Sequence, residues 1–156
     1  MTNNAKLQPP RRCDGPAMLI AGLGEYHTFQ DLSGLPAQWQ RFRTLHVPKR
    51  IGSVAYGVCY NTDDNGFDYI AGVEVSDFDS IPPEFARAKL NPQHYAVFSH
   101  PGHVSTVHET FMAIFREWFP NSNEQPAAAP VFERFDERFI GQTGLGGFEI
   151  WVPLKA

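Results

Sequence analysis

The segments Tyr69–Val75 (YIAGVEV) and Phe148–Leu154 (FEIWVPL) decide the fold, because each one closes one of two similar halves of the chain. In both segments apolar residues occupy alternate positions, and a glutamate falls in the other set. Side chains alternate between the two faces of a strand, so each segment predicts a strand with one apolar face. Because the same order of elements precedes both segments, we predict a strand–helix–strand–strand unit that occurs twice, at about 16–79 and 92–155.

The first unit begins with a predicted strand at 17–29. Apolar residues at helical spacing predict a helix near 35–45, with Ser33 as its N-cap. Alternating residues then predict a strand at 53–62, and a turn at Asp63–Gly66 leads to its partner strand at 67–78.

The second unit follows a proline-containing link at 79–92 and starts with a predicted strand at 93–100. Thr106 and Glu109 have the spacing of a capping box for a helix that Pro120 ends. Strands are predicted at 131–139 and 148–154. The fold class is therefore α+β: an antiparallel sheet with both helices on one face. The polar residues 1–15 are expected to be a disordered lead-in, and 16–156 a single domain.

Composition excludes several classes of function. The 156 residues include 13 lysines and arginines against 17 acidic residues, a net charge of −4, which disfavours direct nucleic-acid binding. The two cysteines, Cys13 and Cys59, have no metal-ligand spacing and are typical of a reducing compartment. Neither a signal peptide nor a run of apolar residues long enough to span a membrane is present, so we expect a cytoplasmic protein with no membrane contact.

The sheet face opposite the helices is the first candidate for a binding site. The alternation predicts that Glu149 and Trp151 share this face with Glu74 and Gly72, and that Tyr60 on a neighbouring strand reaches its rim. A carboxylate beside aromatic rings is how proteins bind organic cations. The alternative is a salt bridge between Glu149 and Arg134 on an adjacent strand.

No motif in the chain predicts a cofactor, a metal or a catalytic residue. Gly22 and Gly24 lack the third glycine of a dinucleotide loop, and the chain has neither a phosphate loop nor a CxxC pair. His94, His100, His103 and His108 are close in sequence, but their spacing does not match that of metal ligands, so we interpret them as turn and strand residues.

Several ordered segments resemble one known family. They are YIAGVEV at 69–75, YAVFSHPG at 95–102, WFPNS at 118–122, PVFE at 130–133 and EIWVPL at 149–154. Together they are similar to the GyrI-like, or AraC-type effector-binding, family over about 16–155. The resemblance implies a duplicated domain with a central cleft that binds amphipathic, often cationic, small molecules. It also implies a glutamate near the cleft floor, a role assigned here to Glu149 and secondarily to Glu74.

In many relatives this domain follows a helix-turn-helix module, for which the first fifteen residues are too short, so a stand-alone sensor is expected. The favoured function is binding of cationic or amphipathic small molecules without catalysis. The ring candidates for the pocket wall are Trp151, Tyr69, Tyr60, Trp118 and Phe98. One alternative is a hydrolase of strained electrophilic toxins that uses a cleft glutamate. Another is a protein-interaction module of the gyrase-inhibitor type. Exposed sheet edges would allow a homodimer, or the partner would be a separate regulator protein.

Overall fold

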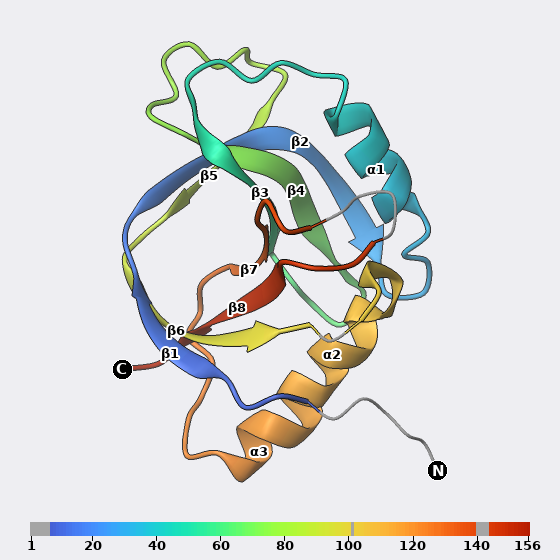
Figure 1. The fold of residues 1–156 in the computed structure, drawn as a ribbon, viewed down its shortest axis with the longest axis vertical. Helices are drawn as coiled ribbons and strands as arrows, with labels where there is room; N and C mark the ends of the chain where they lie inside the picture. Colours follow the sequence, from blue (N-terminus) through green and yellow to red (C-terminus); the bar gives the residue numbers. More distant parts are fainter. Residues whose placement is uncertain (1–6, 101, 140–143) are drawn as a thin grey trace.

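The computed structural model describes residues 7–100, 102–139 and 144–156 (Figure 1). Eight antiparallel strands form a single sheet in the order β1-β6-β8-β7-β3-β4-β2-β5. The strands are β1 (Arg11–Gly15), β2 (Met18–Thr28), β3 (Arg50–Tyr60), β4 (Gly66–Val75), β5 (Ala86–Leu90), β6 (Gln93–Ser99), β7 (Val131–Phe135) and β8 (Phe148–Leu154). The sheet curls into a half-barrel, and the two helical segments lie to its right in Figure 1. The predicted α+β class is confirmed.

The order of strands in the sheet shows how the two predicted units are arranged. The first unit contributes the neighbours β2-β4-β3, and the second contributes β6-β8-β7 in the mirrored order, so that β3 and β7 meet at the centre. There Gly57 pairs with Glu133. The duplicated strand–helix–strand–strand arrangement is therefore confirmed.

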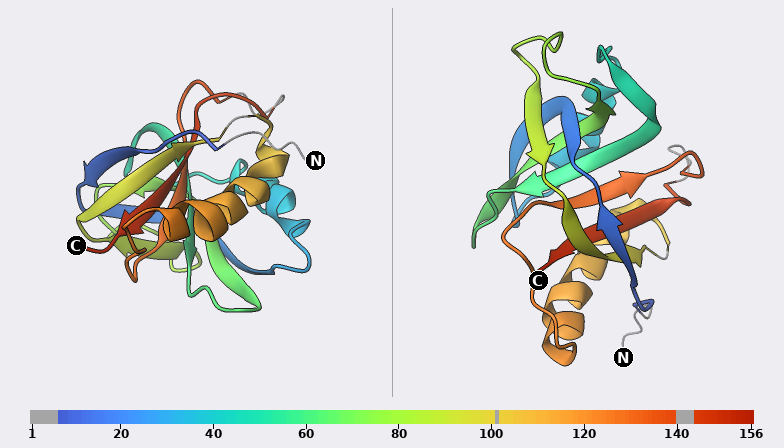
Figure 2. Two further views of the ribbon diagram at one scale, coloured as in Figure 1. Left: turned by 90° about the horizontal axis from the view of Figure 1, so that it is seen from below. Right: turned by 90° about the vertical axis from the view of Figure 1, so that its left-hand side faces the viewer.

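Each unit exchanges an outer strand with the other. β1 precedes the first unit but pairs with β6 of the second, and β5 precedes the second unit but pairs with β2 of the first. The two ladders run from Arg11 opposite Val97 to Gly15 opposite Gln93, and from Met18 opposite Leu90 to Gly22 opposite Ala86. β1 and β2 form one long ribbon, β5 and β6 form another, and these two ribbons lie side by side in Figure 2.

These two outer strands correct the sequence-based prediction. The expected disordered lead-in is wrong for residues 11–15, which form β1, and the link at 79–92 contains β5. β1 has no one-sided apolar pattern. β5 does place Ala86, Ala88 and Leu90 at alternate positions, but this pattern is only five residues long and two of its three apolar residues are alanines. Both are short strands at the ends of the sheet order. Residues 1–6 lie outside the described part of the chain.

The helices form where they were predicted, but their ends differ. α1 spans Gly34–Phe42, and its N-cap residue Ser33 makes no capping bond with its side chain; instead Asp31 accepts hydrogen bonds from the backbone and hydroxyl of Ser33. The second helix starts with a 3₁₀ turn at Val104–Thr106, capped by the side chain of His103. Thr106 donates to the carbonyl of His103, so the predicted capping box does not form.

The second helical segment continues through α2 (Val107–Ala113), a π-helical turn (Ile114–Trp118) and α3 (Phe119–Asn121). Pro120 lies inside the last turn rather than after it. A proline has no N–H to donate to the preceding turn, and the helical segment ends at Asn121, one residue after it.

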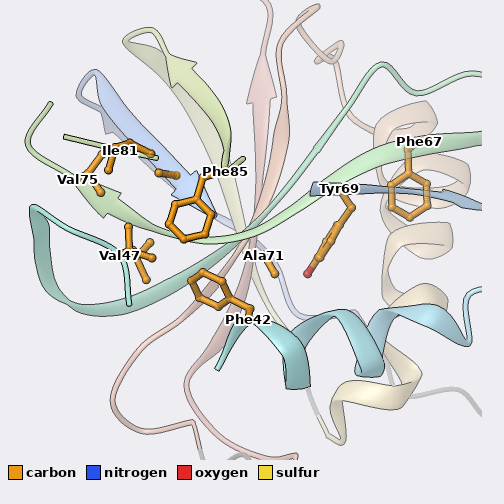
Figure 3. Close-up of a cluster of buried hydrophobic side chains, with 10 residues drawn as sticks. Phe42, Val47, Phe67, Tyr69, Ala71, Val75, Ile81 and Phe85 are labelled. Carbon is orange, nitrogen blue, oxygen red and sulfur yellow. The ribbon is translucent and has the colours of Figure 1, made fainter. Parts of the chain in front are cut away.

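The buried apolar side chains form three clusters. One lies between α1 and the first unit, drawn in Figure 3, and one lies between α2 and the second unit. The third fills the face opposite the helices with Ile20, Val58, Ile70, Val97 and Phe132 from both units. The expectation of a cleft on that face is wrong, because the curled sheet encloses the face and packs it with side chains.

Candidate ligand-binding site

A cavity of about 930 Å³ lies on the helix side of the sheet, where the two units meet. α1, the segment that starts the second helix, and strands β3, β4 and β7 supply its lining. Its volume is within the range of small-molecule pockets. The predicted central cleft thus has its counterpart on the opposite side of the sheet from the predicted one.

Glu133 on β7 provides the buried acid of this cavity. Its residue exposure is 7%, and the Tyr69 hydroxyl donates a hydrogen bond of 2.5 Å to its Oε1. Burial raises the pKa of Glu133 to about 7, and the hydrogen bond from Tyr69 opposes this effect. Burial also raises the pKa of Tyr69 well above its usual value, so this hydroxyl remains a donor. The acid can therefore change charge near neutral pH.

Aromatic rings surround this acid. Trp39 on α1 donates from its indole nitrogen to the Tyr69 oxygen at 3.0 Å, which completes a chain of hydrogen bonds to Glu133. The Trp39 ring packs edge-on against Phe135, which in turn contacts Phe139. All of these residues line the cavity. Figure 3 shows Tyr69 projecting from β4 on the side of α1.

Gln38 holds α1 in place over the sheet. Its side chain is fully buried, and its amide donates to the backbone carbonyls of Leu23 and Tyr69 at 2.7 and 3.0 Å. Its carbonyl oxygen lies 2.6 Å from a ring nitrogen of the buried His27. A buried polar group is tolerated when it is hydrogen-bonded in this way. The next residue, Trp39, is thereby fixed above Tyr69.

Gly57 on β3 leaves the space that Glu133 and Tyr69 occupy. A methyl group at this position would overlap the Tyr69 hydroxyl and would lie 2.5 Å from Oε1 of Glu133. The glycine faces Glu133 directly in the ladder between β3 and β7. The carboxylate can lie close to the sheet because this strand position has no side chain.

Glu149 and Trp151, the first predicted site residues, lie outside this cavity. Glu149 accepts hydrogen bonds from Arg11 at 2.8 Å and from the Trp151 indole at 3.1 Å, and Arg134 is 3.9 Å away. Arg11 also lies over the Trp151 ring at 5.8 Å. Burial opposes ionisation of Glu149, but the bonds from Arg11 and Trp151 outweigh it and lower its pKa. This carboxylate and indole do hold a cation, and that cation is the chain's own Arg11.

Among the other predicted site residues, only Tyr69 lines the cavity. Gly72 is buried against the backbone of β2, and Glu74 is half-buried on the same face as Gly72. Tyr60 packs at the edge of the cluster opposite the helices. Phe98 and Trp118 pack together under the second helix, with ring centroids 5.2 Å apart. The structure therefore does not bring the predicted set together.

Sequence reasoning missed Glu133, although the signal was present. β7 reads Val131–Phe135 (VFERF), and the alternation that singled out Glu149 also places Glu133 between Val131 and Phe135 on the helix face. An acid between two apolar neighbours on a buried face is the same signal that was applied to the last strand. Trp39 was predicted only as a helix core residue.

Two further observations concern metal ions and membranes. Within the described ranges, no group of three or more histidine, cysteine or acidic side chains is placed to hold a metal ion. In the same part of the chain, no helix is long and apolar enough to cross a membrane.

Comparison with known proteins agrees with this fold. Residues 8–155 match the family model described as the GyrI-like small molecule binding domain. The transcriptional regulator BrlR of Pseudomonas aeruginosa is 31% identical over 148 residues, which cover 92% of this chain and 54% of BrlR. The chain thus spans about half the length of that relative.

Solved structures share the fold at lower identity. A putative bacterial transcription regulation protein from Staphylococcus aureus superposes with a TM-score of 0.72 at 20% identity, covering 98% of this chain and 100% of that one. SAV2435, solved bound to tetraphenylphosphonium, gives 0.72 at 19% identity and covers 97% and 95% of the two chains. The EcmrR C-terminal domain gives 0.66 at 11% identity, with 96% and 98% covered.

Proposed function

We propose, from the premise that this chain belongs to the GyrI-like family of small-molecule binding domains, that its cavity binds amphipathic cations. Glu133 at the floor of the cavity carries the proposal. A ligand cation would give this buried carboxylate a charged partner, since its hydrogen-bond donor among the described residues is the neutral Tyr69 hydroxyl. The tetraphenylphosphonium bound to SAV2435 belongs to this chemical class.

The rings around Glu133 support the same ligand class. Trp39, Phe135 and Phe139 offer aromatic faces and edges to an apolar ligand body, and organic cations bind aromatic faces. The cavity volume of about 930 Å³ admits a drug-sized molecule. Shape and apolar contact would supply most of the affinity, and Glu133 would select for charge.

Two matched substitutions test the proposal. At pH 8, Glu133→Gln should weaken the binding of tetraphenylphosphonium by about ten- to a hundredfold, because opposite unit charges about 6–12 Å apart attract each other by about 1.4–2.8 kcal/mol at an effective dielectric constant of about 20. The neutral triphenylphosphine oxide should be affected much less. Glu149→Gln is the control: it removes a buried carboxylate outside the cavity and should leave both affinities unchanged. Titration calorimetry measures the six affinities, those of the wild-type protein included. If Glu149→Gln weakens cation binding and Glu133→Gln does not, the assignment is wrong.

Hydrolysis of a strained electrophile is a second candidate, and the pKa of Glu133 favours it. A carboxylate with a pKa of about 7 inside a cavity is suited to take a proton from water as a general base. Water would then add across the strained ring bond, its oxygen joining one carbon and a proton the other. Incubation with a cyclopropane-bearing electrophile followed by mass spectrometry tests this. A product that contains one added water, and that is absent with Glu133→Gln, would favour the enzyme; complete recovery of the compound would favour binding alone.

A further inference from the structure

The charges that line the cavity do not suit a simple cation alone. Among the described lining residues Glu133 is the single carboxylate, whereas two arginines and three histidines share the cavity: Arg43, Arg50, His46, His103 and His108. Both arginines are exposed, and within the described ranges neither makes an ion pair. Guanidinium groups remain charged at all relevant pH values. The cavity therefore carries at least as much positive charge as negative charge.

Positive and negative groups occupy different parts of the cavity. Arg50, at the start of β3, pairs with Val75, whereas Gly57, which faces Glu133, pairs with Ala71. Val75 and Ala71 are four residues apart on β4, a separation of about 13 Å at about 3.3 Å per residue. The arginine thus enters the cavity from the end of the strand that lies away from the acid.

Arg43 extends the positive region along α1. It is the C-cap residue of the helix and follows Trp39 by four positions, so it lies on the same side of the helix as the indole. The cavity surface therefore runs from the acid through the Trp39 and Tyr69 rings to a helix end that carries a guanidinium.

We propose, resting on the proposed function, that the ligands of this cavity are amphipathic zwitterions. The cationic centre and apolar body lie against Glu133 and the rings, and a carboxylate or similar anionic group at the far end contacts Arg43 and Arg50. A pure cation contacts the acid but makes no use of the two guanidinium groups. A zwitterion of matching length satisfies both ends.

A pair of phosphonium probes isolates the anionic end. Carboxybutyl-triphenylphosphonium and pentyl-triphenylphosphonium share the cation and the number of tail carbons, and they differ only by a carboxylate in place of a methyl group. The carboxylate probe should bind the wild-type protein roughly three- to tenfold more tightly at low salt, the range expected of contacts with exposed arginines. The difference should shrink in high salt because exposed charges are screened.

Variants of the two arginines test whether these residues cause the preference for the carboxylate probe. In the double variant Arg43→Gln/Arg50→Gln, the preference for the carboxylate probe should disappear. The affinity for the pentyl probe should stay the same or improve. Arg41→Gln is the matched control, because Arg41 belongs to α1 but pairs with Glu25 and does not line the cavity. It should leave the preference intact. Thermal melting confirms that each variant is folded.

The outcomes separate this inference from the proposed function. Equal affinity for the two probes, or tighter binding of the pentyl probe, overturns the inference and leaves cation binding standing. A carboxylate preference that survives in the double variant also overturns it, because the arginines would then not be responsible. Failure of both probes to bind overturns the proposed function together with the inference.

Discussion

At the scale of single residues, Glu133 makes ligand binding depend on pH. Burial raises its pKa to about 7, so the protonated form dominates below that pH and the carboxylate dominates above it. We expect the affinity for pentyl-triphenylphosphonium to rise between about pH 6 and pH 8 by up to roughly tenfold, because the ionised fraction of Glu133 rises from about 0.1 to about 0.9 over this range. Fluorescence or calorimetric titration across this range measures the rise. A flat profile for the wild-type protein, or the same rise in Glu133→Gln, would contradict the assignment.

Gly57 is the second residue with a specific expectation. Gly57→Ala should push the Tyr69 hydroxyl and the Glu133 carboxylate apart, because the added methyl group takes the space in which they meet. The bond from Tyr69 lowers the pKa of Glu133, so its loss should move the midpoint of the pH profile upward. Tyr69→Phe removes the same bond without adding bulk and should shift the midpoint in the same direction. An unchanged midpoint in Gly57→Ala would show that the glycine has no such role.

At the scale of secondary-structure elements, Arg11 connects β1 to β8 through Glu149. The pKa of Glu149 lies below its ordinary value, so the stabilisation from this pair is present at neutral pH and is lost as the pH falls through the folded-state pKa. Arg11→Gln should lower the free energy of unfolding at pH 7 by roughly 1–2 kcal/mol, since it leaves a buried carboxylate without its main partner. Urea unfolding measures it. The loss should be smaller at pH 3, and an equal loss at both pH values would exclude the ion pair as its cause.

At the scale of the whole molecule, the exchanged outer strands make residues 11–15 part of the fold. Deleting residues 1–15 removes the β1–β6 ladder and the Arg11–Glu149 pair, and we expect a loss on the order of 2–4 kcal/mol in the free energy of unfolding. Amide hydrogen exchange should locate the effect: amides of β6 should lose protection, while those of β3 and β7 should retain it. A truncated protein with an unchanged unfolding midpoint would mean that β1 contributes little.

The sequence could predict those elements of the fold that bury one regular apolar face. Alternation and helical spacing placed six strands and both helices, because these elements bury one regular face. β1 was missed because it has no apolar alternation, and β5 was missed because its alternating residues Ala86, Ala88 and Leu90 are few and mostly small. Glu149 was chosen as the site acid because the sequence places it next to the indole of Trp151. The sequence does not show which cation binds this pair. The strand order decides that, because it places Arg11 opposite Val97 and Val97 opposite Trp151, next to Glu149.

The exchanged strands also mean that neither half is self-sufficient. A cut within the segment 76–85, between β4 and β5, would give two polypeptides, each holding a strand that belongs beside the other. The cavity draws its walls from both pieces, with Trp39 and Tyr69 on one and Glu133 and Phe135 on the other. A ligand that spans this junction should drive reassembly of the co-expressed fragments. The fold would then work as a split reporter for its own ligand, with fragment association measured by fluorescence anisotropy as the signal.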